Sequence, residues 1–214
     1  MNLFYSLAYR FGFTPWERAA AHPPAADHVA RLFDDEERGR QPPFGRALDV
    51  GRGSGHWSVV LAQRGWQVVG VDVVPAAVEA ARARVRAADL DVEIVQADVT
   101  RLRTAGIDPG FRLIWDFGTI HGLTPAQRVA VGRELTGLAA ADAALLMLVW
   151  APGRRGPLPR GASRGDLEQA FPHWEITGEQ PFDATGLPRP LRSADPRIYR
   201  LCLRDRHRRF PEGR

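Results

Sequence analysis

From residue 46 onward, short apolar runs rich in β-branched residues alternate with alanine-rich stretches of helical spacing. This alternation is typical of βαβ units and of a mainly parallel sheet. The apolar runs predict seven strands, at Ala47–Val50, Gln67–Val71, Val92–Gln96, Leu113–Phe117, Ala144–Val149, Trp174–Thr177 and Ile198–Leu203. The stretches between them predict helices near Gly55–Arg64, Pro75–Ala88, Pro125–Ala139 and Ser163–Phe171. Helix-start signals support this assignment: Thr124 precedes Pro125, and Ser163 stands three residues before Asp166.

The connection between the last two predicted strands, residues 178–197, is rich in proline and shows no helical spacing. A parallel pair needs a long crossover, so this short connection predicts antiparallel neighbours. The expected fold is a single-domain, Rossmann-like α/β fold. Its seven-stranded, mostly parallel sheet is flanked by helices and has an antiparallel strand at the C-terminal end.

The first 45 residues have a different pattern. Apolar residues such as Leu3, Leu7 and Leu32 fall at helical spacing, while Pro15 and the pair Pro23-Pro24 interrupt the segment. We expect residues 1–45 to form helices over the C-terminal edge of the sheet. They would serve as a lid there, because ligands of open α/β sheets bind at that edge, or they would only cover core. The α/β domain would then span residues 46–204, followed by a basic, flexible tail at 205–214.

Composition and charge narrow the setting. The chain has 214 residues, 44% of them hydrophobic, which is ample for one core. Its net charge is +4, but basic and acidic residues are interleaved along most of the chain, and only the tail is visibly clustered. We therefore expect no nucleic-acid partner. The longest apolar run, 143–150, is too short to span a bilayer.

The remaining compositional features point to the cytoplasm. The chain begins without the basic region and cleavage site of a signal peptide, and the lone Cys202 cannot form an internal disulfide. We expect a cytoplasmic protein without a metal site, acting as a monomer or homodimer.

A glycine-rich turn is the densest chemical signal in the sequence. The first strand delivers Asp49, and Gly51, Gly53 and Gly55 then lead into a helix. Glycine lets the backbone approach a ligand where a Cβ would collide, and the N–H groups of the helix start face that ligand. Taken alone, such a turn could be only a strand-to-helix connection.

Two further acids raise the specificity of this signal. Asp72 ends the second strand, 21 residues after Gly51, where the two hydroxyls of a ribose would need acceptors. Asp98 follows the third strand, where it could accept a hydrogen bond from an adenine amine. Each acid could be a turn or helix cap, but acids at three consecutive strand ends favour a nucleoside ligand.

A nicotinamide dinucleotide is the first rival ligand. The glycines alternate as Gly51-x-Gly53-x-Gly55, which differs from the G-x-G-x-x-G of dinucleotide sites. Asp49 would also repel a pyrophosphate, whereas it tolerates the ammonium of a methionine moiety. The residues therefore favour S-adenosylmethionine (SAM).

The sequence resembles the class I SAM-dependent methyltransferases and, more narrowly, their small thiopurine and thiol/halide methyltransferase-like branch. The segments that carry this resemblance are Thr14-Pro-Trp-Glu17, Leu48–Gly55, Val71-Asp72, Phe111–Leu123 and Gly156–Asp166. The resemblance implies SAM contacts at Asp49, Gly51, Gly53, Gly55, Asp72, Val73, Asp98 and Val99, with Trp16 closing over the cofactor. It also implies that Asp116 to His121 line the place where methyl group and acceptor meet.

Three departures from that pattern bear on function. Arg52 replaces the usual cysteine, Thr119-Ile120 replace Cys-Phe, and Ala140–Ala143 have lost a Pro-Gly-Gly turn. The lost turn should affect only a loop. Thr119 and Ile120 could indicate a different acceptor from that of the branch.

Methyl transfer from a sulfonium is an in-line displacement, which alignment alone can accelerate. An acceptor that must lose a proton needs a base, for which His121 and then Asp116 are the candidates. His121 could instead bond backbone at a strand end, and Asp116 could cap the loop or hold the methionine ammonium. Tyr9, Phe13, Thr119 and Trp150 are candidate acceptor contacts, although the aromatic ones could equally be core.

The predicted function is transfer of a methyl group from SAM to a small-molecule nucleophile such as a thiol, halide, hydroxyl or amine, with release of S-adenosylhomocysteine (SAH). A macromolecule-directed methyltransferase is one alternative, but the strand-four motif, Trp115–Gly118, is not an Asn-Pro-Pro-Tyr/Phe base pocket. A second alternative is a SAM-binding regulator or natural-product enzyme that transfers no methyl group.

Overall fold

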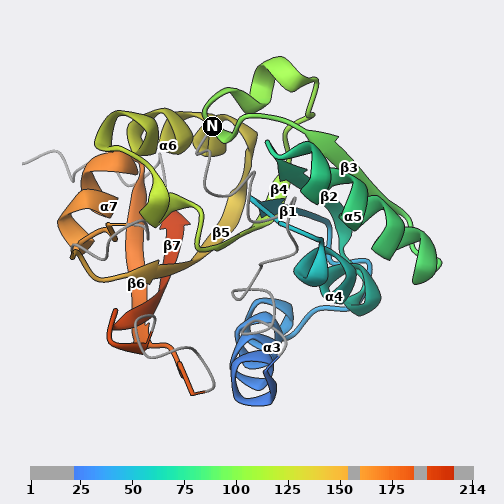
Figure 1. The fold of residues 1–214 in the computed structure, drawn as a ribbon, viewed down its shortest axis with the longest axis horizontal. Helices are drawn as coiled ribbons and strands as arrows, with labels where there is room; N and C mark the ends of the chain where they lie inside the picture. Colours follow the sequence, from blue (N-terminus) through green and yellow to red (C-terminus); the bar gives the residue numbers. More distant parts are fainter. Residues whose placement is uncertain (1–21, 154–159, 186–191, 205–214) are drawn as a thin grey trace, which may run out of the picture.

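A computed structural model provides the structure, which describes residues 22–153, 160–185 and 192–204. One seven-stranded sheet runs through the molecule in the order β3-β2-β1-β4-β5-β7-β6 (Figure 1). Strand β7 is antiparallel to both β5 and β6, and the other neighbouring strands are parallel. The strands are β1 (Arg46–Val50), β2 (Gln67–Asp72), β3 (Val92–Gln96), β4 (Phe111–Phe117), β5 (Ala139–Trp150), β6 (Trp174–Pro181) and β7 (Pro196–Leu203). The predicted mostly parallel, Rossmann-like sheet is confirmed.

Five α-helices and two 3₁₀-helices surround the sheet in the part of the chain that the structure describes. They are α3 (Pro23–Glu37), α4 (His56–Arg64), α5 (Pro75–Ala87), η1 (Val99–Ala105), η2 (Ile120–Gly122), α6 (Pro125–Leu138) and α7 (Arg164–Ala170). Capping boxes begin α6 and α7, with Thr124 and Ser163 accepting from the backbone N–H three residues on. The two 3₁₀-helices were not predicted, because segments of three to seven residues carry no helical periodicity.

Alternating strand residues build two apolar layers, one on each face of the sheet. Ile114 of β4 faces α6 and α7, where it joins Leu135 and Phe171. Its neighbour Trp115 faces α3 and α4, where Phe33 and Trp57 meet it edge-on with ring centroids 5.2 and 5.8 Å away. Both faces are therefore covered, which leaves the strand ends as the place for a ligand.

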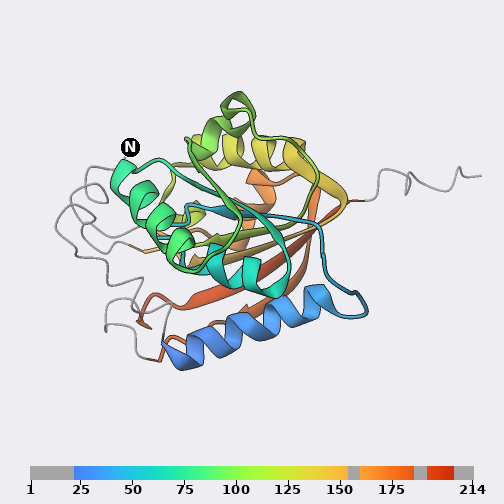
Figure 2. The same cartoon turned by 90° about the vertical axis from the view of Figure 1, so that its right-hand side faces the viewer.

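Helix α3 lies along one face of the sheet (Figure 2). Its buried stripe includes Val29, Leu32 and Phe33, and Glu37 accepts from Arg64 and from the indole N–H of Trp66. The prediction that this segment covers the C-terminal edge is wrong for most of α3, because its apolar stripe matches the aromatic face beside α4. Residues 1–21, with the rest of the predicted lid, lie outside the described residues.

Strand β5 starts directly where α6 ends, at Ala139. Its pairing with β4 shifts register between Phe111 and Leu113, opposite Ala139 and Ala144. The segment 140–143, predicted as a loop, is thus absorbed into an irregular strand start. This change lies at the sheet edge opposite the glycine turn.

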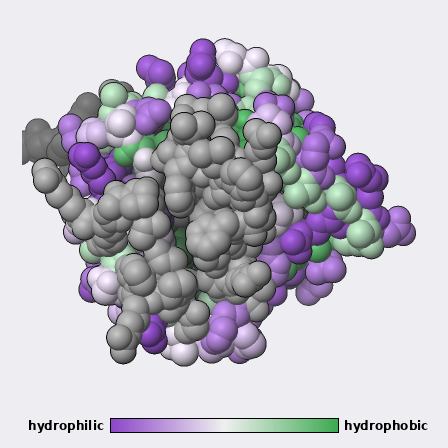
Figure 3. Space-filling view, viewed as in Figure 1, coloured by the Kyte–Doolittle hydropathy of each residue, from purple (hydrophilic) through white to green (hydrophobic). Residues whose placement is uncertain are grey.

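Few large apolar side chains reach the surface of the described residues. Only Val73 and Val129 among them are exposed, at 37% and 45%. Hydrophilic residues predominate around the rim of the face in Figure 3. Among the described helices, none is long and apolar enough to cross a membrane.

Candidate cofactor and acceptor site

The glycine turn joins β1 to α4 in left-handed backbone conformations. Gly51, Gly53 and Gly55 have φ angles of 61°, 57° and 80°, which side chains disfavour. Packing adds a second demand. A Cβ on Gly51 would lie 1.8 Å from Thr119 Oγ1, and one on Gly55 would lie 2.8 Å from the Cβ of Ala81. The glycines are therefore required by the protein's own packing as well as by the turn.

Asp72 organises this turn from the end of β2. Its Oδ2 accepts from the backbone N–H of Gly53 at 2.9 Å, and its Oδ1 accepts from Val74 at 2.9 Å. Burial raises the pKa of this carboxyl, and the hydrogen bonds from Val74 and Gly53 oppose that rise. A carboxylate has about four acceptor positions, so capacity remains for two ribose hydroxyls. The exposed Val73 beside it offers an apolar contact at the rim.

Asp49 lies below the turn. Its Oδ2 accepts from Ser58 Oγ at 2.6 Å, and its side chain is only 1% exposed. Burial raises the pKa of Asp49 to about 6, against the opposing effects of Ser58 and Arg52. The sequence interpretation missed Ser58, although its place on the first turn of α4 faces it toward the strand end. Asp49 is therefore enclosed beneath the turn, where a cofactor would meet its charge rather than its oxygens.

Asp98 caps η1, one of the alternatives that the sequence left open. Its Oδ1 accepts from Thr100 N at 2.9 Å and from Thr100 Oγ1 at 2.6 Å. The side chain is 43% exposed, so its second oxygen can still accept from an adenine amine. Val99, a predicted cofactor contact, has its side chain buried in the layer under α6. Only its backbone can face a ligand.

Asp116, a candidate base in the sequence, caps the turn after β4. Its Oδ1 accepts from Gly118 N at 2.9 Å and Thr119 N at 2.6 Å, and its Oδ2 accepts from Ile120 N at 3.0 Å. The side chain is 1% exposed, and burial raises its pKa to about 7. Because three backbone N–H groups enclose this buried carboxyl and leave it about one acceptor position, we assign Asp116 to the shape of the turn.

Thr119 connects the ends of β1 and β4. Its Oγ1 donates to the carbonyl oxygen of Val50 at 3.1 Å, and the side chain occupies the space beside Gly51. The predicted acceptor contact is thus engaged in packing between two strand ends. Thr119 therefore supports the glycine turn from the end of β4.

His121 and Trp150 lie together, as two predicted site residues from different strand ends. Their rings stack with centroids 4.5 Å apart and an interplanar angle of 18°. The backbone N–H of Trp150 donates to His121 Nδ1 at 3.3 Å. An Nδ1 that accepts leaves the proton of the neutral ring on Nε2.

We expect this contact to select the Nε2–H tautomer of His121, which makes Nε2 a hydrogen-bond donor. In ¹⁵N-labelled protein at neutral pH, His121 should show Nδ1 as the unprotonated nitrogen in a long-range ¹H–¹⁵N correlation spectrum. A His121→Gln variant assigns the signal. Observation of the Nδ1–H tautomer would contradict the prediction and restore Nε2 as a candidate base.

Arg128 of α6 holds the segments around His121 and was missed by the sequence interpretation. Its Nε donates to Ile120 O at 3.2 Å and its Nη2 to Gly161 O at 2.5 Å, while Ala162 N donates to Trp150 O at 2.9 Å. The guanidinium is buried, and burial lowers its pKa. No feature of the sequence signalled this role, because α6 also carries the polar residues Gln127, Arg133 and Glu134.

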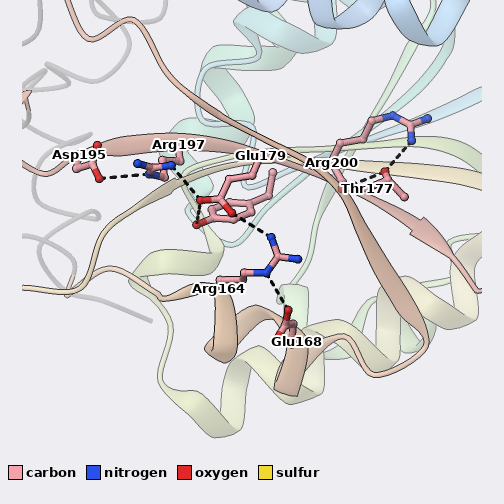
Figure 4. A network of polar contacts seen from close by, with 8 residues as sticks. Arg164, Glu168, Thr177, Glu179, Asp195, Arg197 and Arg200 are labelled. Atoms are coloured by element: carbon pink, nitrogen blue, oxygen red, sulfur yellow. Dashed lines mark hydrogen bonds and ion pairs between the residues drawn. The ribbon is translucent and has the colours of Figure 1, made fainter.

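A polar cluster on β6, β7 and α7 reaches the same edge of the sheet (Figure 4). Glu179 accepts from Arg164 at 3.1 Å, from Arg197 at 3.0 Å and from Tyr199 at 3.3 Å. Arg197 also pairs with Asp195, and its backbone lies opposite Val149, next to Trp150. These mutual ion pairs tie α7 to the antiparallel strands beside the His121–Trp150 pair.

Several predicted contacts cannot be placed. Tyr9, Phe13 and Trp16 lie outside the described residues, as do Thr14–Glu17 and part of Gly156–Asp166. They remain predictions from the sequence.

Comparisons with known proteins agree with this geometry. Residues 47–141 match the protein family described as a methyltransferase domain. An N-methyltransferase from Bradyrhizobium japonicum in complex with SAH is 14% identical, with a TM-score of 0.70 over 88% of this chain and 91% of that chain. Magnesium protoporphyrin IX methyltransferase from Synechocystis with bound SAM is 18% identical, with a TM-score of 0.69 over 94% of this chain and 96% of that chain.

A third solved structure is 1,6-didemethyltoxoflavin-N1-methyltransferase from Burkholderia thailandensis. It is 19% identical, with a TM-score of 0.70 over 95% of this chain and 87% of that chain. At these identities the likeness concerns the fold. The methyltransferase-domain match over residues 47–141, together with the fold, supports a SAM-dependent methyltransferase with SAM as its cofactor.

Proposed function

We propose that this chain transfers the methyl group of SAM to a small-molecule acceptor that binds beside His121 and Trp150. The observation that most strongly supports this proposal is that contacts connect the ends of β2, β1 and β4 along one edge of the sheet. Hydrogen bonds connect Gly53 to Asp72 and Val50 to Thr119, and the turn capped by Asp116 carries Thr119 on toward His121. Cofactor and acceptor residues thus lie on one connected rim.

The residues at this rim fit SAM. Asp72 would accept from the ribose hydroxyls, Val73 would contact the adenine, and Asp98 would accept from its amine. The turn from Gly51 to Gly55 would pass beside the methionine moiety. When bound, SAM supplies an electrophilic methyl carbon on a sulfonium, and alignment of the acceptor with it accelerates transfer.

On the acceptor side, the proposal rests on the His121–Trp150 pair. Trp150 provides an aromatic surface whose indole N–H has no hydrogen-bond partner among the described residues. His121 Nε2–H would donate to the acceptor and orient it. Two of the structural neighbours are methyltransferases named for small molecules, magnesium protoporphyrin IX and 1,6-didemethyltoxoflavin. The thiopurine and thiol/halide branch remains one hypothesis for the acceptor, and the altered pair Thr119-Ile120 argues for testing oxygen and nitrogen acceptors equally.

A panel assay tests the proposal. The protein is incubated with SAM and separate thiols, halides, phenols and amines, and SAH is measured by mass spectrometry. We expect SAH to form in a time-dependent way with at least one class, and His121→Ala to reduce that rate by about tenfold or more. Val129→Ala, an exposed position on α6, is the matched control.

Two other results would overturn the proposal. SAH formation only with nucleic acid or protein substrates would indicate a macromolecule-directed enzyme. Tight SAH binding without turnover on the panel or on those macromolecules would indicate a SAM-binding protein that transfers no methyl group.

A further inference from the structure

Arg52 is an unusual residue for the interior of a nucleotide-binding turn. It stands between Gly51 and Gly53, and it is only 6% exposed. Its Nη1 donates to the carbonyl oxygen of Gly53 at 2.7 Å and to that of Ala77 at 3.3 Å. Ala77 belongs to the first turn of α5, so one guanidinium joins the turn to the helix packed behind it.

The strand beneath Arg52 makes room for it. A Cβ on Gly70 of β2 would lie 2.3 Å from Arg52 Cδ and 2.8 Å from Ser58 Oγ. The backbone N–H of Arg52 also donates to Val71 O at 3.1 Å. Glycine at position 70 therefore allows a long cationic side chain to run under the turn, where the usual cysteine would fill far less space.

Two buried carboxylates contact the turn and helix that surround this cation: Asp49 accepts from Ser58 Oγ, and Asp72 accepts from the backbone N–H of Gly53. Asp49 on β1 and Asp72 on β2 are 1% and 8% exposed, and they repel each other. Burial raises the pKa of both, and the charge of Arg52 opposes that rise for both. Burying two carboxylates that repel each other is unfavourable unless a cation lies nearby.

The other titratable or charged groups around the turn come from α4, α5 and β4. His56 is the first residue of α4, and its ring packs against the ring of Trp57. Arg84 of α5 donates to the backbone carbonyl oxygen and to the hydroxyl of Ser54. Asp116 of β4 interacts unfavourably with Asp49. Among these groups Arg52 is the cation that lowers the pKa of both acids.

We propose that Arg52 is a positioning residue for the cofactor, whose buried guanidinium braces the glycine turn against α5 and keeps Asp49 and Asp72 ionised at neutral pH. Ionised Asp72 is the form that accepts from both ribose hydroxyls, and both charges attract the cofactor's ammonium. Loss of the cation leaves the two carboxyls more easily protonated. As the pH is lowered, cofactor affinity should then begin to fall at a higher pH than in the wild type.

The test is the pH profile of SAH affinity, measured by calorimetric titration from pH 5.5 to 9. Arg52→Met keeps the length of the side chain and removes its charge. We expect the midpoint of the affinity loss to rise by about one pH unit, which makes SAH binding about fivefold weaker at the wild-type midpoint and close to tenfold weaker below it. The loss should shrink toward pH 9, where both acids ionise without help. Arg82→Met is the matched control, because Arg82 lies exposed on α5, where it pairs with Glu79 and donates to the carbonyl oxygen of Ile94, away from the glycine turn.

Arg52→Lys separates charge from bracing. Lysine keeps the cation but lacks the planar fork of guanidinium, so its midpoint should stay near that of the wild type while affinity falls equally at every pH. If Arg52→Met does not fold, Arg52→Lys alone still tests the proposal. An upward shift in the pH midpoint of its SAH affinity would overturn the proposal. A pH-independent loss in Arg52→Met, or none, overturns it as well. Because the probe is SAH alone, these outcomes do not depend on the identity of the methyl acceptor, and failure of the wild type to bind SAH would instead contradict the cofactor.

Discussion

Replacement of Asp72 by alanine should weaken SAH binding by about a hundredfold or more. The carboxylate accepts from Gly53 and Val74 and is the proposed partner of both ribose hydroxyls. A hydrogen bond to a charged group contributes about 1.5–3 kcal/mol, so loss of the two ribose bonds costs about 3–6 kcal/mol. Isothermal titration with SAH measures this directly.

The same substitution also leaves two backbone N–H groups without their acceptor, so folding must be monitored by thermal unfolding. Asp72→Asn keeps one acceptor oxygen and should lie between alanine and the wild type. Asp91→Ala is the matched control, because Asp91 is exposed and precedes β3 at the opposite edge of the sheet. A folded Asp72→Ala protein that binds SAH as tightly as the wild type would contradict the assignment of the ribose site.

The sequence predicted the frame of this site because the frame depends on local patterns. Seven apolar runs became seven strands, and the acids at the ends of β1 and β2 meet the glycine turn as expected. The parallel arrangement brings consecutive strand ends to one edge whatever the side chains do. Residue type and order were therefore sufficient for the sheet and for the contact between Asp72 and the glycine turn.

What the sequence could not give is the direction of each side chain. Asp116 and Asp98 have the same chemistry, yet one is enclosed by three backbone N–H groups and the other keeps a partly exposed oxygen. Arg52 and Arg128 looked like two of 29 interleaved arginines, although both are buried braces. Their roles depend on contacts between elements far apart in the chain, which periodicity does not report.

The position of α3 is a second feature that depends on contacts between elements far apart in the chain. Helical spacing gave its apolar stripe correctly, but a stripe does not specify which surface it will meet. The deciding partners are aromatic rings on α4 and β4, Trp57 and Trp115, which come together only in the folded sheet. A helix expected at the strand ends therefore lies along the face.

The second large effect concerns the contact between Gly51 and Thr119. Gly51→Ala should destabilise the protein by about 3 kcal/mol: about 1–2 from the left-handed backbone and about 1–3 from overpacking against Thr119. The new Cβ would lie 1.8 Å from Thr119 Oγ1, so the turn must move. Chemical unfolding measures the stability loss, and SAH titration should show weaker binding because Gly53 is displaced from Asp72.

A double-mutant cycle identifies the cause. Thr119→Gly removes the colliding side chain and the hydrogen bond to Val50, and it should recover about 1 kcal/mol or more of the loss in Gly51→Ala. Gly106→Ala is the matched control, because its φ of 77° carries the same backbone penalty with no atom within 4 Å of the added Cβ. Thr119→Gly should leave the cost of that control unchanged. Additive losses for Gly51→Ala and Thr119→Gly would mean that Thr119 does not occupy this space in solution, and its hydroxyl would again be a candidate contact for the methyl acceptor.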